Sequence, residues 1–470
     1  MSKMLLEISN TELDLANYYI EKIAEINNQK AMPPKASVVT HGCQMNARDS
    51  EKLAGMLSAM GYEVVHSDKE SEAFDLVIFN TCCVRENAEN KLYGNLGSYK
   101  AEKYKNRAMK LVLCGCMMQQ DAVVDKVKES YPYVDVIFGT HNIYRFPELL
   151  YSNIETGGMI VDIWKDAAEI VEDLPSLRQF PYKASVNIMY GCDNFCTFCI
   201  VPYVRGRERS RNPEDIIAEI ESLVADGVSE ITLLGQNVDS YGKGLDISFA
   251  DLLYKISEID GLFRIRFMSS HPKDINDDVI AAMRDLDKVC KHLHLPFQAG
   301  STNVLKKMNR GHTKEEYLEL ISRVKAAVPG ISITTDIMVG FPGETEEDFL
   351  DTLDVVKQVR FTGAFTFLYS RRQGTIADRM QNQVPEHVMK ERFGRLLNVV
   401  NDISHEVMQE KLGKVLQVVP EDEGQDGILR GRADDNSLVH FKGSSALLGS
   451  VVNVKIFEAR TFYLKGEIIE

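Results

Sequence analysis

The chain has 470 residues, of which 44% are hydrophobic and 26% are charged, and its formal net charge is −15. This length exceeds what one hydrophobic core usually organises, so we expect about three domains. No apolar run approaches the length of a membrane span, and acidic residues follow the N-terminus too soon for a signal peptide. We therefore expect a cytoplasmic protein with no membrane partner. The net negative charge argues against a protein that coats nucleic acid non-specifically, but it is compatible with RNA binding by a local basic patch.

Residues 1–34 are predicted to be an extension with an amphipathic helix over 12–27, which we interpret as a packing element. Residues 35–152 then alternate strand and helix. Repeated units of this kind predict a parallel, flavodoxin- or Rossmann-like sheet with helices on both faces. The expected strands are 36–40, 75–80, 111–114 and 134–138, and the expected helices are 47–60, 86–105 and 121–130.

A cysteine follows each of three predicted strands in this region: Cys43, Cys82 and Cys116. The carboxyl ends of parallel strands meet at one edge of a sheet, so these thiols are expected to converge. Thiolates are the usual ligands of iron–sulfur clusters, and a set of three leaves one iron of a [4Fe–4S] cluster open. The sequence leaves the roles of Cys83 and Cys114 undecided.

Residues 153–180 are interpreted as a connection. Residues 181–410 then repeat strand and helix six times, which predicts an open (β/α)6 partial barrel with its chemistry at the carboxyl ends of the strands. The expected strands are 184–190, 230–235, 263–269, 289–295, 331–339 and 363–369, and the expected helices are 213–225, 249–259, 276–284, 314–327, 346–359 and 386–409. Cys290, within one of these strands, is interpreted as a core residue.

The loop after the first barrel strand contains Cys192, Cys196 and Cys199 in a CxxxCxxC pattern. A zinc knuckle would need a fourth ligand nearby, and an odd number of thiols argues against disulfides. The spacing resembles the radical S-adenosylmethionine (SAM) superfamily, in which the open iron of a [4Fe–4S] cluster chelates SAM.

Other polar or aromatic residues near this loop and at the ends of the barrel strands are candidate SAM contacts: Phe198, Gln236, Asn237, Ser269 and Gln298. A catalytic base at His271 is a weaker hypothesis, and the Gly-Phe-Pro-Gly turn at 340–343 is interpreted as at least partly architectural. Arginine forks match phosphates, so the arginines that follow the cysteine loop and the sixth strand are candidate RNA contacts: Arg205, Arg207, Arg209, Arg211 and Arg372.

Residues 411–470 change period, with five short predicted strands at 414–419, 427–432, 437–442, 450–459 and 462–468. This pattern predicts a small OB-like β-barrel, an architecture often used to bind nucleic acid. Its aromatic residues could stack on bases or fill the barrel core.

Taken together, the cysteine motifs of residues 36–470 resemble those of the methylthiotransferase family, and the C-terminal region looks like a TRAM domain. The motifs that carry the resemblance are Gly42-Cys43-Gln44-Met45-Asn46, Asn80-Thr81-Cys82, Gly115-Cys116 and the loop from Cys192 to Cys199. The resemblance implies a radical SAM [4Fe–4S] cluster on Cys192, Cys196 and Cys199, and an auxiliary [4Fe–4S] cluster on Cys43, Cys82 and Cys116. It also implies SAM as radical source and methyl donor, the tRNA anticodon stem-loop as substrate, an external electron donor such as a flavodoxin or ferredoxin, and a monomer.

Gln44-Met45-Asn46 and the segment Tyr369-Ser370-Arg371-Arg372-Gln373-Gly374-Thr375 favour the branch that methylthiolates isopentenylated adenosine next to the anticodon. Cys83, Cys114, Arg371 and Ile376 depart from the expected pattern. Alternative targets are threonylcarbamoyl adenosine or an aspartate of a ribosomal protein. A distant alternative is a non-catalytic iron–sulfur sensor that binds RNA.

Overall fold

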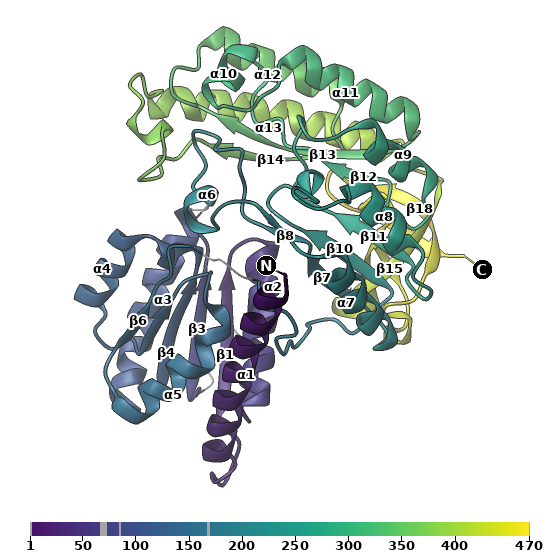
Figure 1. Cartoon of the computed structure of the whole chain (residues 1–470). Helices are drawn as coiled ribbons and strands as arrows, with labels where there is room; N and C mark the ends of the chain where they lie inside the picture. The colour runs from purple at the N-terminus through teal and green to yellow at the C-terminus, as the bar shows by residue number, and fades with distance from the viewer. Residues whose placement is uncertain (1, 66–72, 84–85, 167–169, 470) are drawn as a thin grey trace. The chain divides into compact units, whose positions relative to one another are not determined.

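The computed structural model describes residues 2–65, 73–83, 86–166 and 170–469 (Figure 1). Close contacts divide the chain into two compact units. Unit 1 comprises Met1–Gln179, Tyr190–Asp193 and Ile200–Glu208, and unit 2 comprises Phe180–Met189, Asn194–Cys199 and Arg209–Glu470. The five-part division expected from the sequence stays a prediction. No helix in the described part of the chain is both long and apolar enough to cross a membrane.

Unit 1 is built on a six-stranded parallel sheet in the order β2-β1-β3-β4-β5-β6. The strands are β1 (Lys35–His41), β2 (Glu63–Val64), β3 (Leu76–Thr81), β4 (Lys110–Gly115), β5 (Val136–Phe138) and β6 (Ile160–Asp162). Every residue of β3 is buried, as is typical of a strand covered on both faces. The predicted parallel α/β sheet is confirmed.

Helices cover both faces of this sheet and form a separate apolar core on each. One core contains residues of α1 (Ser2–Asn27), α2 (Gln44–Ala59) and α5 (Phe146–Thr156), and the other contains residues of α3 (Glu86–Lys105) and α4 (Asp121–Ser130). Ile20 and Ile23 of α1 are buried in the first core, which confirms that the N-terminal helix packs onto the sheet.

Unit 2 contains six parallel strands that follow one another in chain order. They are β7 (Lys183–Asn187), β10 (Glu230–Leu234), β11 (Arg264–Phe267), β12 (His292–His294), β13 (Ser332–Val339) and β14 (Gly363–Leu368). Two three-stranded sheets are joined by the bridge between Ile265 and Val289. This is the order of the predicted partial barrel.

Helices cover the outside of these strands, and one apolar core joins strands and helices. The helices in that core are α7 (Pro213–Ala225), α8 (Phe249–Ser257), α9 (Asp277–Asp285), α11 (Lys314–Ala327), α12 (Glu346–Val359) and α13 (Glu386–Gln409). Alternate strand residues such as Ile231 and Leu233, or Ile333 and Ile337, contribute to it. The opposite face of each strand is therefore left for polar residues.

The C-terminal segment forms a closed five-stranded barrel in the order β15-β16-β17-β19-β18. Its strands are β15 (Val415–Glu423), β16 (Ile428–Ala433), β17 (Leu438–Lys442), β18 (Val452–Ala459) and β19 (Leu464–Ile468). Phe441 is buried in its core, whereas Phe457 and Phe462 are 60% and 72% exposed. The predicted small barrel is confirmed, and its aromatic residues divide between core and surface.

This barrel packs against the amino ends of the parallel strands of unit 2. Arg264 donates hydrogen bonds to the carbonyls of Arg432 (2.9 Å) and Gln417 (2.8 Å). Arg266 donates to the carbonyl of Ala433 (2.9 Å) and pairs with Glu230 (3.0 Å). The C-terminal barrel therefore covers the end of the partial barrel opposite to the one where chemistry is expected.

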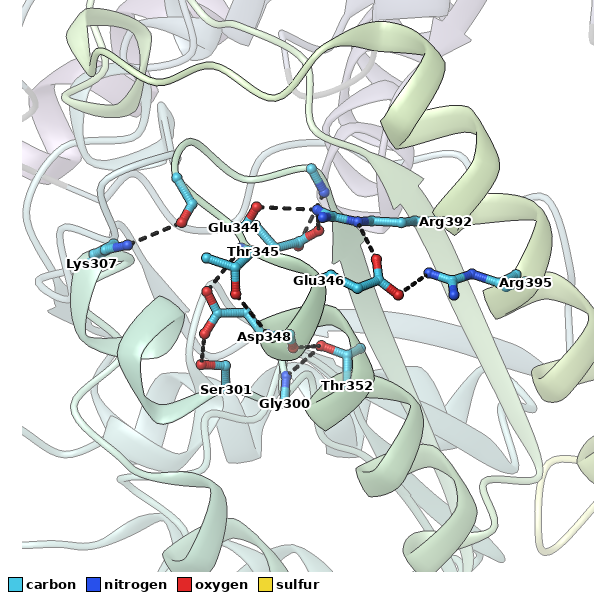
Figure 2. Close-up of polar contacts among 12 residues, drawn as sticks. Gly300, Ser301, Lys307, Glu344, Thr345, Glu346, Asp348, Thr352, Arg392 and Arg395 are labelled. Atoms are coloured by element: carbon cyan, nitrogen blue, oxygen red, sulfur yellow. Dashed lines mark hydrogen bonds and ion pairs between the residues drawn. The ribbon is translucent and has the colours of Figure 1, made fainter.

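A buried polar network fixes the loop after β13, as Figure 2 shows. The Glu344 carboxylate accepts hydrogen bonds from the Gly340 N–H (3.1 Å) and from Arg392 on α13 (2.8 Å). Thr345 and Asp348 form a capping box at the start of α12. The turn at 340–343 is therefore held in place by neighbouring elements, which supports its architectural interpretation.

The same network extends to the loop after β12. Ser301 and Thr345 both hydrogen-bond Asp348, and the Gly300 N–H donates to the Thr352 hydroxyl (2.9 Å). Two strand-end loops of unit 2 are thus tied to the same helix, α12.

Replacing Arg392 with alanine should lower the free energy of unfolding by about 3–5 kcal/mol, because the Glu344 carboxylate would be left buried without its cation. Urea denaturation of the variant measures this. The control is Lys390→Ala on the same helix, whose partner Glu386 is exposed, and it should leave stability unchanged. Equal losses in the two variants would contradict the assignment of Arg392 to a buried network.

Candidate functional site

Three strand ends of unit 1 lie in one row. In the sheet register, His41 of β1 pairs with Thr81 of β3, and Thr81 pairs with Gly115 of β4. Cys82 and Cys116 directly follow their strands, and Cys43 lies two residues beyond β1. The N–H of Cys82 also donates to the carbonyl of His41 (2.8 Å). The structure therefore brings the three predicted cysteine loops to one edge of the sheet.

Two buried asparagines hold these loops together. The Asn46 amide donates to the side-chain oxygen of Asn80 (3.0 Å), and the Asn80 amide donates to the Asn46 carbonyl (2.8 Å). The Cys43 thiol donates to the Asn46 side-chain oxygen (3.3 Å). The position of Cys43 is therefore coupled to the end of β3.

Gly42 and Gly115 make room for this network. A β-carbon on Gly42 would lie 2.6 Å from the Asn46 side chain, and one on Gly115 would lie 2.4 Å from Asn80 Oδ1. Gly115 also has a φ of +95°, which favours glycine. The two glycines therefore leave the space that the side chains of Asn46 and Asn80 occupy.

The environments of the neighbouring thiols distinguish Cys116 from Cys114. A hydrogen bond with Cys83, together with the charge of Arg205, lowers the pKa of Cys116 to about 6 against the opposing effect of burial. Cys114 lies in the apolar core beside α2, where burial raises its pKa well above the ordinary value. Because the thiolate is the ligand form, Cys116 is the better donor.

Arg205 lies inside this site rather than on the surface. It is 5% exposed, its Nη2 is 2.7 Å from Asp49 Oδ2, and its Nε donates to Cys116 Sγ at 3.1 Å. Arg211 is buried too, paired with Glu219 (2.7 Å). Arg205 and Arg211 therefore pair with interior groups. Because a buried guanidinium cannot meet a phosphate at the surface, these two residues do not offer the RNA contacts predicted for them.

The other three arginines of that prediction are at least partly accessible. Arg207 is exposed and pairs with Asp193 (2.7 Å), Arg209 is half-buried, and Arg372 is half-buried and donates to Ser370 Oγ (2.8 Å). A role in RNA binding stays a prediction for Arg207, Arg209 and Arg372.

The second half of the CxxxCxxC loop is anchored through Thr197. Its N–H and hydroxyl donate to the carbonyls of Met308 (3.0 Å) and Lys307 (2.9 Å), and its carbonyl accepts from the Ala377 N–H (2.8 Å). Phe198 packs against an adjoining apolar cluster that contains Met308 and Ala377. These hydrogen bonds fix the loop at Thr197, which lies between Cys196 and Cys199 in the sequence.

Arg310 is a site residue that the sequence analysis missed. It is buried, donates to Cys196 Sγ (3.5 Å) and to the Pro296 carbonyl (2.7 Å), and follows the short helix α10 (Thr302–Lys307). A single arginine after a helix has no distinguishing pattern. Only the fold brings it to the cysteine loop.

Four of the five predicted SAM contacts lie at neighbouring strand ends of unit 2, and the fifth, Phe198, lies in the cysteine loop. Ser269 after β11 and Gln298 after β12 have φ angles of +70° and +67°. Such conformations cost on the order of 1–3 kcal/mol each in non-glycine residues and often occur at ligand sites. Asn237, after β10, is buried beside half-buried Gln236.

Asn237 has an unused acceptor. Its amide donates to Asp274 (2.7 Å), whereas its buried Oδ1 has no hydrogen-bond partner among the described residues. A ligand amine or hydroxyl would satisfy that oxygen. Burial lowers the pKa of His271, which makes its imidazole a weaker base, and its Nδ1 accepts from the Lys273 N–H (3.3 Å).

The donor chemistry of both cysteine sets is that of iron–sulfur clusters. In the described ranges, no three His, Cys, Asp or Glu side chains converge as a mononuclear site requires. Each thiolate of a [4Fe–4S] cluster binds a different iron, so its ligands surround a wider body. Three thiols at one sheet edge, and three within the eight residues from Cys192 to Cys199, provide the ligand type that these clusters take.

Family models match three segments: the radical SAM superfamily over residues 186–356, the uncharacterized protein family UPF0004 over 35–139, and the TRAM domain over 409–469. The tRNA-2-methylthio-N(6)-dimethylallyladenosine synthase of Lachnoclostridium phytofermentans is 54% identical over 96% of this chain and 98% of its own length. The protein of the same name from Clostridioides difficile is 55% identical over 96% of each chain. The chain belongs to the methylthiotransferase family.

Solved structures support the fold of this methylthiotransferase. The radical SAM methyltransferase TsrM from Kitasatospora setae, with tryptophan and a SAM analogue bound, has a TM-score of 0.51 at 15% identity over 73% of this chain and 75% of its own. A second TsrM structure, with cobalamin and a [4Fe–4S] cluster bound, has the same TM-score at 14% identity over 85% and 77%. At this identity the likeness concerns the fold alone.

Replacing Gly115 with alanine should displace the Cys116 loop, because the new β-carbon would meet Asn80 and the backbone at φ +95° and ψ −173° costs about 1–3 kcal/mol for an L-residue. We expect less iron per chain after anaerobic reconstitution and a lower unfolding temperature. Gly97→Ala within α3 is the control, because nothing lies within 4 Å of its β-carbon, and it should stabilise the helix by about 0.5–1 kcal/mol. Full iron binding by the Gly115 variant would contradict the assignment.

Proposed function

We propose that this chain is a tRNA methylthiotransferase that converts isopentenylated adenosine next to the anticodon to its 2-methylthio derivative. One observation carries the proposal: three cysteines follow three parallel strands of the unit 1 sheet and three more lie on the single loop after the first barrel strand, β7, in a chain 54–55% identical to the two named synthases over nearly its whole length. A single set would suffice to cleave SAM. The second set supports a reaction that inserts sulfur.

The ligand assignment follows the two sets. Cys192, Cys196 and Cys199 would hold the cluster that binds SAM. Cys43, Cys82 and Cys116 would hold the auxiliary cluster. When bound, these groups supply hydrogen-atom abstraction from an unactivated aromatic C2–H and a methylated sulfur to replace that hydrogen.

The chain's own residues bind, orient and shield these groups. Four of the six candidate ligands, Cys82, Cys116, Cys192 and Cys196, are buried and so shielded from water, whereas Cys199 is half-buried and Cys43 is exposed. Asn237 Oδ1, which is buried without a hydrogen-bond partner among the described residues, would accept a hydrogen bond from SAM. Ser269 and Gln298, which follow the carboxyl ends of β11 and β12 with left-handed backbone, would supply further polar contacts.

RNA recognition requires that the target base leave its stack. Enzymes that act on a base turn it out, and single-stranded loops are where proteins read RNA bases. Arg207, Arg209 and Arg372 are the candidate phosphate contacts, and the exposed Phe457 and Phe462 of the C-terminal barrel are candidate stacking surfaces. Action as a cytoplasmic monomer with an external flavodoxin or ferredoxin belongs to the same proposal.

Anaerobically reconstituted protein given SAM, a reductant and isopentenylated tRNA should form 2-methylthio-isopentenyladenosine, measured by mass analysis of nucleosides. Unmodified tRNA serves as the control and should give no product. Product only on threonylcarbamoylated tRNA, or only on a ribosomal protein, would reassign the substrate. No SAM turnover under any condition would contradict an enzymatic function.

Cys43→Ala and Cys192→Ala should both abolish methylthiolation but differ in SAM cleavage. The Cys43 variant keeps the CxxxCxxC loop, so 5′-deoxyadenosine should still form. The Cys192 variant should form none.

Cys290→Ala is the matched control. Cys290 is a buried cysteine outside both sets, where burial raises its pKa to about 12, so both activities should persist in this variant. Absence of 5′-deoxyadenosine from the Cys43 variant would contradict the division of labour between the two sets.

A further inference from the structure

The segment Ile200–Glu208 follows the CxxxCxxC loop directly and belongs to unit 1. Ile200 and Val204 form a small apolar cluster with Cys83 and Cys116. The Thr140 hydroxyl, after β5, donates to the Val204 carbonyl (2.8 Å). These contacts place Arg205, the next residue, against the end of β4.

At this position the guanidinium of Arg205 contacts two side chains, the thiol of Cys116 and the negatively charged carboxylate of Asp49. Its Nε donates to Cys116 Sγ at 3.1 Å, while its Nη2 pairs with Asp49 on α2 at 2.7 Å. All three side chains are buried. In such surroundings a charge acts on its neighbours more strongly than in water.

The next residue, Gly206, contacts Cys192, a member of the other cysteine set. The carbonyl of Gly206 accepts a hydrogen bond from the N–H of Cys192 (3.2 Å). Gly191 packs so closely on this segment that a β-carbon would lie 2.0 Å from the Arg207 carbonyl oxygen. Two consecutive residues therefore contact Cys116, through a side chain, and Cys192, through a carbonyl.

We propose that Arg205 is a positioning residue that sets the reduction potential of the auxiliary cluster through its hydrogen bond to Cys116 Sγ, with Asp49 as the opposing charge. The inference rests on the proposed assignment of Cys116 as a cluster ligand. Hydrogen bonds to cluster sulfurs and nearby charge are recognised determinants of the potential. An N–H donor on a ligand sulfur stabilises the reduced form, which carries one more negative charge, and therefore raises the potential.

Because Arg205 and Asp49 carry opposite charges, removing one or the other should shift the midpoint potential of the cluster in opposite directions. Arg205→Gln removes the donor cation and leaves Asp49, so the midpoint potential should fall. Asp49→Asn removes the opposing charge and leaves Arg205, so the midpoint should rise. A purely structural role would not separate the two variants by sign. Arg205→Lys keeps the charge but loses the planar fork that serves Cys116 and Asp49 together, so its midpoint should lie between wild type and Arg205→Gln.

The experiment uses the full chain with Cys192, Cys196 and Cys199 replaced by alanine, so that only the auxiliary cluster is reconstituted. Midpoint potentials are measured by anaerobic dithionite titration followed by electron paramagnetic resonance, with iron content and thermal unfolding recorded for each variant. At a fixed potential below the midpoint, we expect about a tenfold change in the ratio of reduced to oxidised cluster in Arg205→Gln, which corresponds to about 59 mV for a one-electron couple.

Lys103→Gln is the control for the loss of a buried cation. Lys103 pairs with Asp135 (2.6 Å), at the opposite end of the same sheet from the cysteines. The midpoint potential of the Lys103→Gln variant should therefore equal that of the parent, which is the chain with the three alanines and no other change. Unchanged midpoints in the Arg205 variants, shifts of the same sign in Arg205→Gln and Asp49→Asn, or an equal shift in Lys103→Gln would each overturn the inference. If Arg205→Gln does not assemble a cluster, the Arg205→Lys and Asp49→Asn midpoints decide.

The failure of the proposed function has a different signature. If the parent with three alanines binds no cluster, the assignment of Cys43, Cys82 and Cys116 is wrong, and this inference falls with it. If the parent binds its cluster and the Arg205 variants leave the midpoint unchanged, only the role of Arg205 is wrong.

Discussion

The candidate sites depend on one constraint: parallel strands of a sheet end at the same edge. In unit 1, the register of β1, β3 and β4 aligns their last residues, and this alignment brings together cysteines that are 39 and 34 positions apart (82 − 43 and 116 − 82). In unit 2 the same rule gathers Asn237, Ser269 and Gln298 from three consecutive strands. Side chains that are distant in sequence thus meet without any local motif to connect them.

The strand-end rule also explains why asparagine and glycine surround the thiols of unit 1. Chain segments that turn away from adjacent strands leave backbone groups without sheet partners, and buried groups of that kind need hydrogen bonds. Asn46 and Asn80 supply some of them, and the Thr81 hydroxyl adds a bond to the Cys114 carbonyl (3.0 Å). Gly42 and Gly115 leave the space that these side chains occupy. The scaffold of the candidate cluster site is therefore a polar network with thiols at its margin.

Most of the fold could be predicted from the sequence because its elements have strong periodicity. The helices α3, α4, α11, α12 and α13 begin and end where the pattern placed them. The short elements β2, β6 and α6 (Val201–Val204) were not predicted, because two to four residues carry too little periodicity. Cys43, Cys82 and Cys116 were predictable since each follows a strand.

The roles of the arginines could not be predicted, because sequence gives charge but not burial. Arg205 and Arg207 are two residues apart in one basic run, yet the first is buried against Asp49 and the second is exposed. Arg310 stands alone in the sequence and contacts Cys196. A basic run on a loop contains both buried and exposed residues. It therefore predicts a surface patch only when its backbone is known to stay at the surface.

The position of the C-terminal barrel restricts how RNA can use it. Arg264 and Arg266 attach this barrel to the amino ends of the parallel strands, whereas the cysteine loop and the candidate SAM contacts lie at the carboxyl ends. A strand of eight residues such as β13 is roughly 26 Å long. An RNA that touches the C-terminal barrel while its base enters the carboxyl end must therefore extend along the partial barrel for at least that length. On this geometry, the C-terminal barrel would meet a part of the RNA remote from the modified base.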